Sequence, residues 1–343
     1  MELFFGEGGG RLRALWRLLC QYLAYKATVP LLTNLLVAAY LAILGGRGVV
    51  SRGGSDASPL PGFPVLALIG AIAALIVTLL SVWLAGRFLD RRPFADFGFH
   101  LRSGGWWLDL LFGLALGALL MTFVFIVELG LGWITVIEAW ETVQSGASFA
   151  LAMLPPIGLF VCVGVYEETL SRGYQLRNLA EGLNYPALGP RGAILLAWIL
   201  SSIFFGALHI GNPNATFLST ANIAVAGLML GLGYVLTGEL AIPMGLHITW
   251  NFFQGNVFGF PVSGLKPLGV TFLEIEQGGP ETWTGGPFGP EAGLIGVSAM
   301  ILGCLLITLW VRLRSGKVAV HTPLAEEPKP GGPASDPSPP AEM

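Results

Sequence analysis

Eight apolar stretches, each long enough to cross a lipid bilayer, constrain the fold of this chain more than any other feature. They lie near residues 28–46, 61–86, 106–128, 148–168, 191–211, 217–236, 241–260 and 292–312. A spanning helix needs about 20 apolar residues, and the chain is 54% hydrophobic and only 11% charged. Such a chain has too little polar surface for a soluble globule. We therefore expect an all-α polytopic membrane protein with about eight transmembrane helices.

The distribution of lysine and arginine predicts the orientation of these helices. Of the 18 Lys and Arg residues, 15 lie in alternate segments between spans, a set that includes both termini, and 3 lie in the others. Positively charged segments stay in the cytoplasm, so both termini are predicted to be cytoplasmic in a multi-pass plasma membrane protein. Seven or nine spans would remove this asymmetry, which supports the number eight independently of hydropathy. The Gly-, Ala- and Arg-rich composition is typical of a bacterial protein.

Two flanking regions differ from the membrane domain at 28–314. Residues 1–27 spread arginines among apolar residues without a cleavage site, so we interpret them as a basic interfacial segment and not as a signal peptide. Residues 315–343 hold 7 of the 23 prolines and few large apolar side chains, which predicts a disordered tail; His321 lies there without an assigned role. The three scattered cysteines predict neither a disulfide framework nor a metal site.

Ionisable groups within the spans carry the strongest functional signal, because charges are costly in lipid. The first group is EETLSR, at the end of the fourth span. On a helix Glu168 and Arg172 share a face and are predicted to form an ion pair, while Glu167 points about 100° away and stays available. The alternative is an ordinary interfacial helix end. We expect the helix to continue to a stop near Gly182, which would place the pair inside it.

Two further clusters contain histidines in later spans. In the fifth span, Phe205 lies one turn before His209, so its ring can pack against the imidazole. In the seventh span, His247 and Asn251 are four residues apart, and both can donate hydrogen bonds into the same space. Taken singly, a snorkelling histidine explains the first cluster and hydrogen bonding between helices explains the second. Together, a carboxylate, two histidines and an asparagine suffice to activate a water and bind an oxyanion.

The three motifs EExxxR, FxxxH and HxxxN, in this order, resemble those of the CPBP family of intramembrane proteases. That family includes the type II CAAX prenyl endopeptidases and Abi-type proteins. The segments RRPFADFGFH (91–100) and TGGPFGPEAGL (284–294) add to the similarity, which covers about residues 85–312. Each motif is short, but the ordered set in a polytopic chain is specific. The resemblance implies a transmembrane protease domain at 28–314 that hydrolyses peptide bonds in or at the membrane.

The resemblance also implies a role for each motif residue. Glu167 would be the general base that activates water, and His209 would hold and polarise that water. His247 and Asn251 would stabilise the tetrahedral oxyanion. Glu168 and Arg172 would support the first motif, which completes a predicted catalytic set on the fourth, fifth and seventh helices.

The sequence does not decide whether the site binds a metal ion. Family members are described both as metalloproteases and as metal-free glutamate proteases. If a metal is present, zinc with Glu167, His209 and His247 as ligands is chemically adequate. No HExxH motif fixes two histidines on one helix, so we slightly favour metal-free chemistry, and we predict no other cofactor site.

Several functions and substrates remain open. We expect a membrane-associated peptide or protein as substrate, either CAAX-like or a bacteriocin or other leader, within the lipid bilayer and without nucleic acid. The sequence lacks the motifs of zinc HExxH, paired-aspartate GxGD and serine GxSG intramembrane proteases. A proton- or ion-coupled transporter is an alternative, although no inverted repeat is evident. An inactive family scaffold or immunity protein is another.

The membrane depths expected for His209 and His247 differ too much for the two side chains to share one site. In straight, alternating spans, His209 falls near the outer end of the fifth span, whereas His247 lies six residues, roughly 9 Å, from the inner end of the seventh. A common site requires one helix to be short, tilted or re-entrant. We expect the bend at HIGNPNATFLS (209–219).

Overall fold

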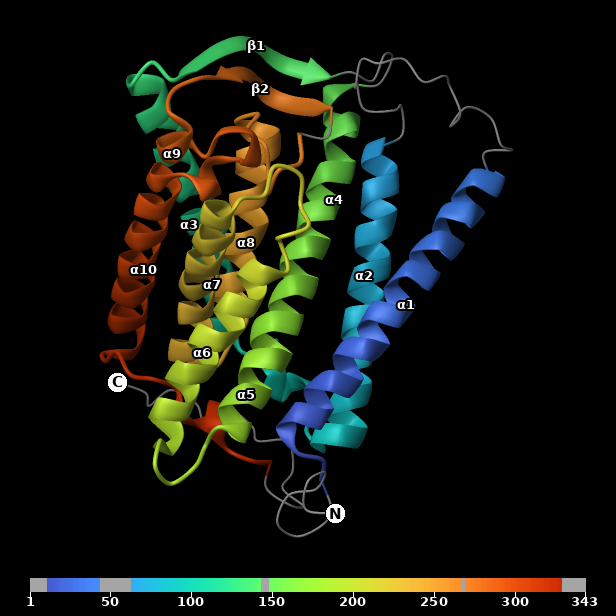
Figure 1. Cartoon of the computed structure of the whole chain (residues 1–343), viewed down its shortest axis with the longest axis vertical. Helices are drawn as coiled ribbons and strands as arrows, with labels where there is room; N and C mark the ends of the chain where they lie inside the picture. Colours follow the sequence, from blue (N-terminus) through green and yellow to red (C-terminus); the bar gives the residue numbers. More distant parts are fainter. Residues whose placement is uncertain (1–10, 44–62, 143–147, 267–268, 329–343) are drawn as a thin grey trace.

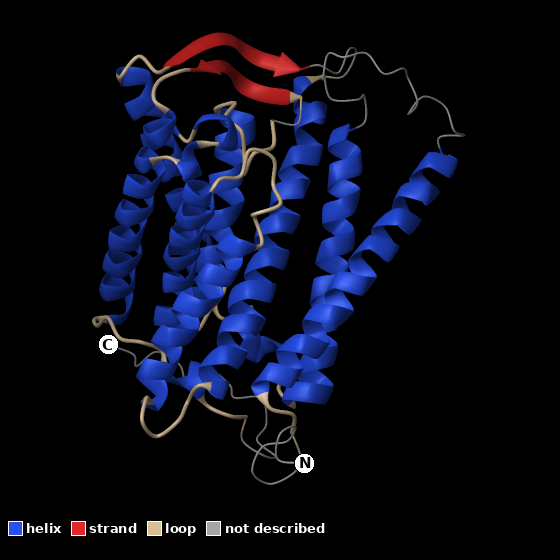
Figure 2. Cartoon of the chain, in the orientation of Figure 1, coloured by secondary structure: helices blue, strands red, loops and turns tan. Residues whose placement is uncertain are grey.

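The structure is a computed structural model that describes residues 11–43, 63–142, 148–266 and 269–328. The chain forms a helical bundle with a two-stranded sheet across one end (Figure 1, Figure 2). The helices are α1 (Ala14–Ile43), α2 (Phe63–Ala85), α3 (Gly104–Gly130), α4 (Phe149–Glu168), α5 (Arg177–Gly182), α6 (Gly189–Ala207), α7 (Phe217–Thr237), α8 (Ala241–Phe252), α9 (Glu281–Thr284) and α10 (Leu294–Ser315). The strands are β1 (Ile134–Thr142) and β2 (Val270–Gln277), and π-helical segments follow α2 (Gly86–Asp90), α4 (Thr169–Leu176) and α8 (Phe253–Val257).

Seven of the eight predicted spans appear as helices long and apolar enough to cross a membrane, which confirms the all-α polytopic fold. The spans are Ala14–Ile43, Pro64–Asp90, Gly104–Gly130, Phe149–Gly182, Gly189–Ala207, Phe217–Thr237 and Leu294–Ser315. The predicted span 241–260 is instead α8, of 12 residues, extended by the five-residue π segment. It ends early because Gly259 takes a positive φ and the Phe260 amide donates back to the Gln254 carbonyl.

Close packing at glycines fixes α8 between α3 and α4. A Cβ at Gly113 of α3 would overlap the Ile242 carbonyl, and one at Gly245 of α8 would overlap the Leu110 carbonyl. A Cβ at Gly164 of α4 would meet the Ile248 side chain of α8. Small residues let membrane helices approach closely and gain van der Waals contact. The short helix that carries the third motif is therefore held on two sides.

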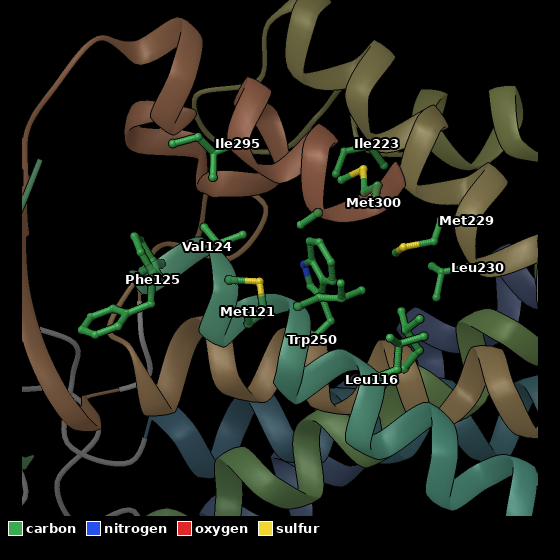
Figure 3. Close-up of a cluster of buried hydrophobic side chains, with 14 of the residues drawn as sticks. Leu116, Met121, Val124, Phe125, Ile223, Met229, Leu230, Trp250, Ile295 and Met300 are labelled. Atoms are coloured by element: carbon green, nitrogen blue, oxygen red, sulfur yellow. The ribbon is translucent and has the colours of Figure 1, made fainter. Parts of the chain in front are cut away.

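The largest buried apolar cluster lies between α3, α7, α8 and α10 (Figure 3). Met121 and Met300 are completely buried in it, and flexible methionines fill irregular gaps between helices. Met229, Leu230 and Trp250 belong to this cluster and also line a cavity that Glu167 lines as well. One side of this core therefore forms part of the wall of that cavity.

The two-stranded sheet was not expected from the sequence. Strands β1 and β2 pair antiparallel from Ile134 opposite Gln277 to Thr142 opposite Val270. The Gln277 side chain donates to the Glu128 carboxylate at 3.0 Å, which ties the sheet to the end of α3. The signal was present in the β-branched and aromatic residues of ITVIEAWET and VTFLEIEQ.

The predicted boundary at residue 27 is absent, because α1 is one 30-residue helix that begins at Ala14. Its first turns are held by charges from distant segments. Arg17 donates to Asp90 at 2.7 Å and to Glu181 at 2.6 Å. Arg92 also donates to Glu181, at 2.8 Å. Residues 11–27 are therefore part of the helical bundle and not a separate interfacial segment.

The predicted disordered tail is wrong for residues 315–328. The 3-10 turn Thr322–Ala325 packs against α5 and α6, with Leu324 fully buried. The Asn184 side chain donates to the Ala325 carbonyl at 3.0 Å, and the His321 amide donates to the Val235 carbonyl at 2.9 Å. Residues 329–343, which hold most of the prolines of the tail, lie outside the described residues. All three cysteines are free.

Candidate active site

Glu167 and Glu168 lie where the helical geometry changes. Glu168 is the last residue of α4, and the next eight residues, Thr169–Leu176, form a π-helical segment before α5 ends at Gly182. The predicted continuation to Gly182 is confirmed, whereas the π segment was not foreseen. Single π turns inside helices are rare and frequently occur at functional sites. The wider turn buries all eight residues after Glu168.

Glu168 is a fully buried carboxylate with two charge-assisted partners. Arg172 donates to its Oε1 at 2.7 Å, which confirms the predicted ion pair. The same oxygen accepts a hydrogen bond from Nδ1 of His247 at 2.8 Å. Arg172 also donates to the Gly227 carbonyl and lies 4.5 Å from the Phe205 ring centroid. Glu168 is thereby committed to holding other side chains in position.

The contact with Glu168 fixes how His247 can act. A carboxylate oxygen only accepts, so Nδ1 of His247 carries the proton that it donates to Glu168. Nε2 then faces the second glutamate, with 3.9 Å between this atom and Oε2 of Glu167. The arrangement orients the ring.

The backbone of the preceding helical turn orients the His209 ring. Its Nδ1 donates to the Phe205 carbonyl at 2.8 Å, so in the neutral ring Nε2 holds the free lone pair. The Phe205 ring lies 5.0 Å from the His209 ring and 6.2 Å from the His247 ring, centroid to centroid. The predicted packing of Phe205 on His209 is confirmed. This one phenyl ring contacts both imidazoles and Arg172.

Glu167 is the available carboxylate of the pair. Its side chain is 22% exposed, against 0% for Glu168, and Tyr166 donates to its Oε1 at 3.2 Å. It lines a cavity of about 670 Å³ together with His209, His247 and Asn251. No hydrogen bond of the Asn251 side chain occurs within the described residues. The cavity is mostly apolar, which strengthens electrostatic interactions inside it.

The conflict in depth is resolved by the short α6. This helix ends at Ala207, two residues before His209, and in Figure 1 it stops well below the end of the bundle that carries the sheet. Residues 208–215 form turns, and α7 begins after Thr216, whose side chain caps the helix by accepting from the Ser219 amide. The predicted bend at 209–219 is therefore present, and it keeps His209 beside His247.

The six predicted site residues come together, but their neighbours include groups that were missed. Lys26 of α1 and Glu291, which precedes α10, line the same cavity. Burial raises the pKa of Glu291 to about 7, and its carboxylate accepts from the Gln254 side chain and from the Ser263 amide. Glu291 lies in the segment 284–294, whose similarity to the family assigns it no role. The sequence places Lys26 in the basic interfacial segment.

The fit of a metal ion depends on whether the ligand atoms converge. Glu167, His209 and His247 offer suitable atoms, but these atoms do not all lie within 4.8 Å of one another. Within the described residues, the one group of three such side chains that lies this close is Glu138, Glu141 and Glu274 on the sheet, two of which are exposed. The candidate site does not fit a preformed three-ligand metal centre.

Residues 147–253 match the family model of the type II CAAX prenyl endopeptidase Rce1-like proteins. The matched range contains all seven residues of the three motifs, from Glu167 to Asn251. This match supports membership of the CPBP family. A match of this kind supports an intramembrane protease function. No curated protein and no solved structure matches the chain.

Proposed function

We propose that this protein is an intramembrane endopeptidase in which Glu167 activates water to hydrolyse a peptide bond of a membrane-associated substrate. The observation that carries the proposal is the unequal environment of two adjacent carboxylates. Glu168 is sealed by Arg172 and His247, whereas Glu167 faces a cavity beside two imidazoles and an amide. A general base must reach the water that it deprotonates, and of this pair Glu167 is the one that can.

The first step forms the bond between water and the scissile carbonyl carbon. Glu167 takes one proton of the water as its oxygen attacks. The Nε2 lone pair of His209 accepts the second hydrogen of that water, because the other ring nitrogen is engaged with Phe205. This contact orients the water for attack.

The carbonyl oxygen becomes an oxyanion between α8 and α4. Asn251 donates to it through its carboxamide, and His247 donates through Nε2 when its ring is protonated. The negative charge of Glu168 at Nδ1 stabilises that imidazolium. The intermediate then collapses: the C–N bond breaks, and Glu167 returns its proton to the leaving amine. One water is consumed, and one carboxylic acid and one amine are formed, which ionise to a carboxylate and an ammonium.

Orientation and substrate class complete the proposal. The arginines of the described ends of α1, α2 and α10 lie at one end of the bundle, as cytoplasmic positive charges would. We place that end in the cytoplasm of a plasma membrane. The substrate is a peptide or protein held at the bilayer, with CAAX-like proteins and leader peptides as the candidate classes.

The test compares new peptide termini in membranes from cells that express the wild-type protein or Glu167→Gln at matched levels. The amide is nearly isosteric with the carboxylate but cannot take the proton of water. Specific termini present with wild type should vanish in Glu167→Gln. Glu138→Gln is the control, since Glu138 is exposed on β1 away from the cavity, and it should preserve them.

Identical termini in all three membranes would contradict the proposal. Proton flux in proteoliposomes would then test the transport alternative, in which Glu167→Gln blocks flux without affecting peptides. Absence of both activities in wild type would favour an inactive scaffold.

A further inference from the structure

Lys26 is a cation in the middle of a membrane-spanning helix. It lies twelve residues after the start of α1 at Ala14 and seventeen before its end at Ile43, roughly 18 Å and 26 Å along the axis. Ionisable side chains at such depth are rare and usually face a functional cavity. The Lys26 side chain is exposed, and it lines the same cavity as Glu167.

The ammonium of Lys26 has no anionic partner among the described residues. Its one contact of note is with the Tyr22 ring, whose centroid lies 5.8 Å from Nζ. The arginines of the bundle behave differently. Arg17, Arg92 and Arg172 each contact a carboxylate within 2.8 Å. A charge that is kept at membrane depth without an internal partner is well placed for an external anion.

The other charges of the cavity favour an anionic ligand. Lys266 lies on its wall as a second cation and likewise has no carboxylate partner in the described chain. Glu291 is buried and its carboxylate accepts from Gln254 and Ser263, so it offers little to a ligand. Glu167 is the base of the proposed reaction. A carboxylate that enters beside Glu167 would meet an unpaired ammonium on α1.

Depth distinguishes a peptide from a lipid as the source of this anion. Arg17 marks the end of the bundle through its contacts with Asp90 and Glu181, and Lys26 lies nine residues, roughly 13 Å, further along the helix. Phospholipid phosphates lie in the headgroup layer, near the helix ends. A peptide that reaches Glu167 instead enters the cavity that Lys26 also lines.

We propose that Lys26 binds a carboxylate of the scissile peptide and thereby selects acidic substrates for the cavity. This inference rests on the proposed function. The carboxylate is either the C-terminus of the peptide or an Asp or Glu side chain near the cleaved bond. Both sources offer the same chemistry, a charge-assisted hydrogen bond to the ammonium.

The test uses quenched-fluorescent peptides that carry an N-terminal palmitoyl group, with the protein in proteoliposomes of neutral phosphatidylcholine. Each peptide is made in three forms. One is acidic through a free C-terminal carboxylate, one is neutral with a C-terminal amide, and one has the C-terminal amide and is acidic through a single internal Glu. Wild type should cleave one or both acidic forms with a kcat/KM about tenfold or more above that of the neutral amide. Preference for the C-terminal acid or for the internal Glu identifies the source.

Variants of Lys26 then assign the selectivity to this side chain. Lys26→Met should raise KM for the acidic peptides about tenfold with little change in kcat, and leave the neutral amide unaffected. Lys26→Arg should restore much of the preference. Lys317→Gln, beyond the end of α10, should match wild type, since Lys317 is exposed away from the cavity. Equal cleavage of acidic and neutral forms by wild type would overturn the inference while the proposed function stands.

Two further outcomes separate the alternatives. If Lys26→Met slows all peptides only in liposomes that contain anionic phosphatidylglycerol, the anion is a lipid phosphate and the inference fails. If wild type cleaves no peptide, binding to Glu167→Gln protein decides. Suppose that Glu167→Gln protein binds the acidic peptides more tightly than the neutral amide, and that the double variant Lys26→Met/Glu167→Gln loses this preference. That result would support the inference although the proposed reaction fails. Equal binding would overturn it.

Discussion

The charges at the end of the bundle where α1 begins and the charges of the cavity follow opposite rules. At the bundle end, Arg17 contacts both Asp90 and Glu181, and Arg92 contacts Glu181, all within 2.8 Å, so two cations match two anions. In the cavity, Glu167 has one weak hydrogen bond, from its neighbour Tyr166. Paired groups hold helices together, while unpaired groups remain available for chemistry. The site contains both kinds side by side, in Glu168 and Glu167.

The largest expected effect comes from breaking the paired part of the site. Arg172→Ala should lower the free energy of unfolding by about 3–5 kcal/mol, because it leaves Glu168 as an uncompensated buried charge. Thermal unfolding of purified protein and the yield in membranes measure this loss. The double variant Glu168→Gln/Arg172→Met, which removes both charges, should recover part of it. Normal stability of Arg172→Ala would show that the pair is exposed to solvent.

A histidine of the cavity should affect turnover and leave the fold intact. His209→Ala should reduce kcat by roughly 10²–10³-fold, about 3–4 kcal/mol in the barrier, since the attacking water loses its acceptor. The unfolding temperature should stay close to that of wild type. Kinetics on a cleaved peptide and a thermal scan of the same preparation give both values. A stability loss as large as that of Arg172→Ala would place His209 with the structural charges.

Glu291 should make stability depend on pH. Burial raises its pKa in the folded protein from 4.5 to about 7, so the folded state keeps a proton that the unfolded state loses. The free energy of unfolding should therefore fall as pH rises from about 4.5 to about 7, by on the order of 3 kcal/mol. Glu291→Gln should remove this slope. Parallel slopes in both proteins between pH 5 and 7.5 would show that another group titrates.

The smallest effect is expected at the bundle end. Arg17→Met should destabilise the protein by about 1–3 kcal/mol, because Asp90 and Glu181 each keep a further donor, Tyr174 and Arg92 respectively. The kcat of a cleaved peptide should not change. A selective loss of kcat with unchanged unfolding temperature would connect this network to the site and remove the contrast between the two regions.

The sequence predicted those parts of the site that depend on local spacing. Glu168 and Arg172 are one helical turn apart, as are Phe205 and His209, and each pair makes the expected contact. Spanning length predicted seven of the helices. Such features follow from helical periodicity and need no knowledge of the fold.

Contacts between distant segments could not be predicted in the same way. The hydrogen bond from His247 to Glu168 joins residues 79 apart in the chain, and the π segment depends on the packing around it. In the sequence, Lys26 cannot be distinguished from an interfacial cation. Its position beside the cavity follows only from the uninterrupted course of α1. The turn at 322–325 was hidden because its composition was averaged with the proline-rich residues that follow.

The central claim is that Glu167 and Glu168, adjacent in sequence, have separate tasks. The most direct measurement is peptide cleavage and thermal unfolding of purified Glu167→Gln and Glu168→Gln proteins in the same proteoliposomes. We predict that Glu167→Gln unfolds like wild type and loses turnover by roughly 10³-fold or more, while Glu168→Gln unfolds at a lower temperature. Wild-type turnover in a well-folded Glu167→Gln protein would contradict the account.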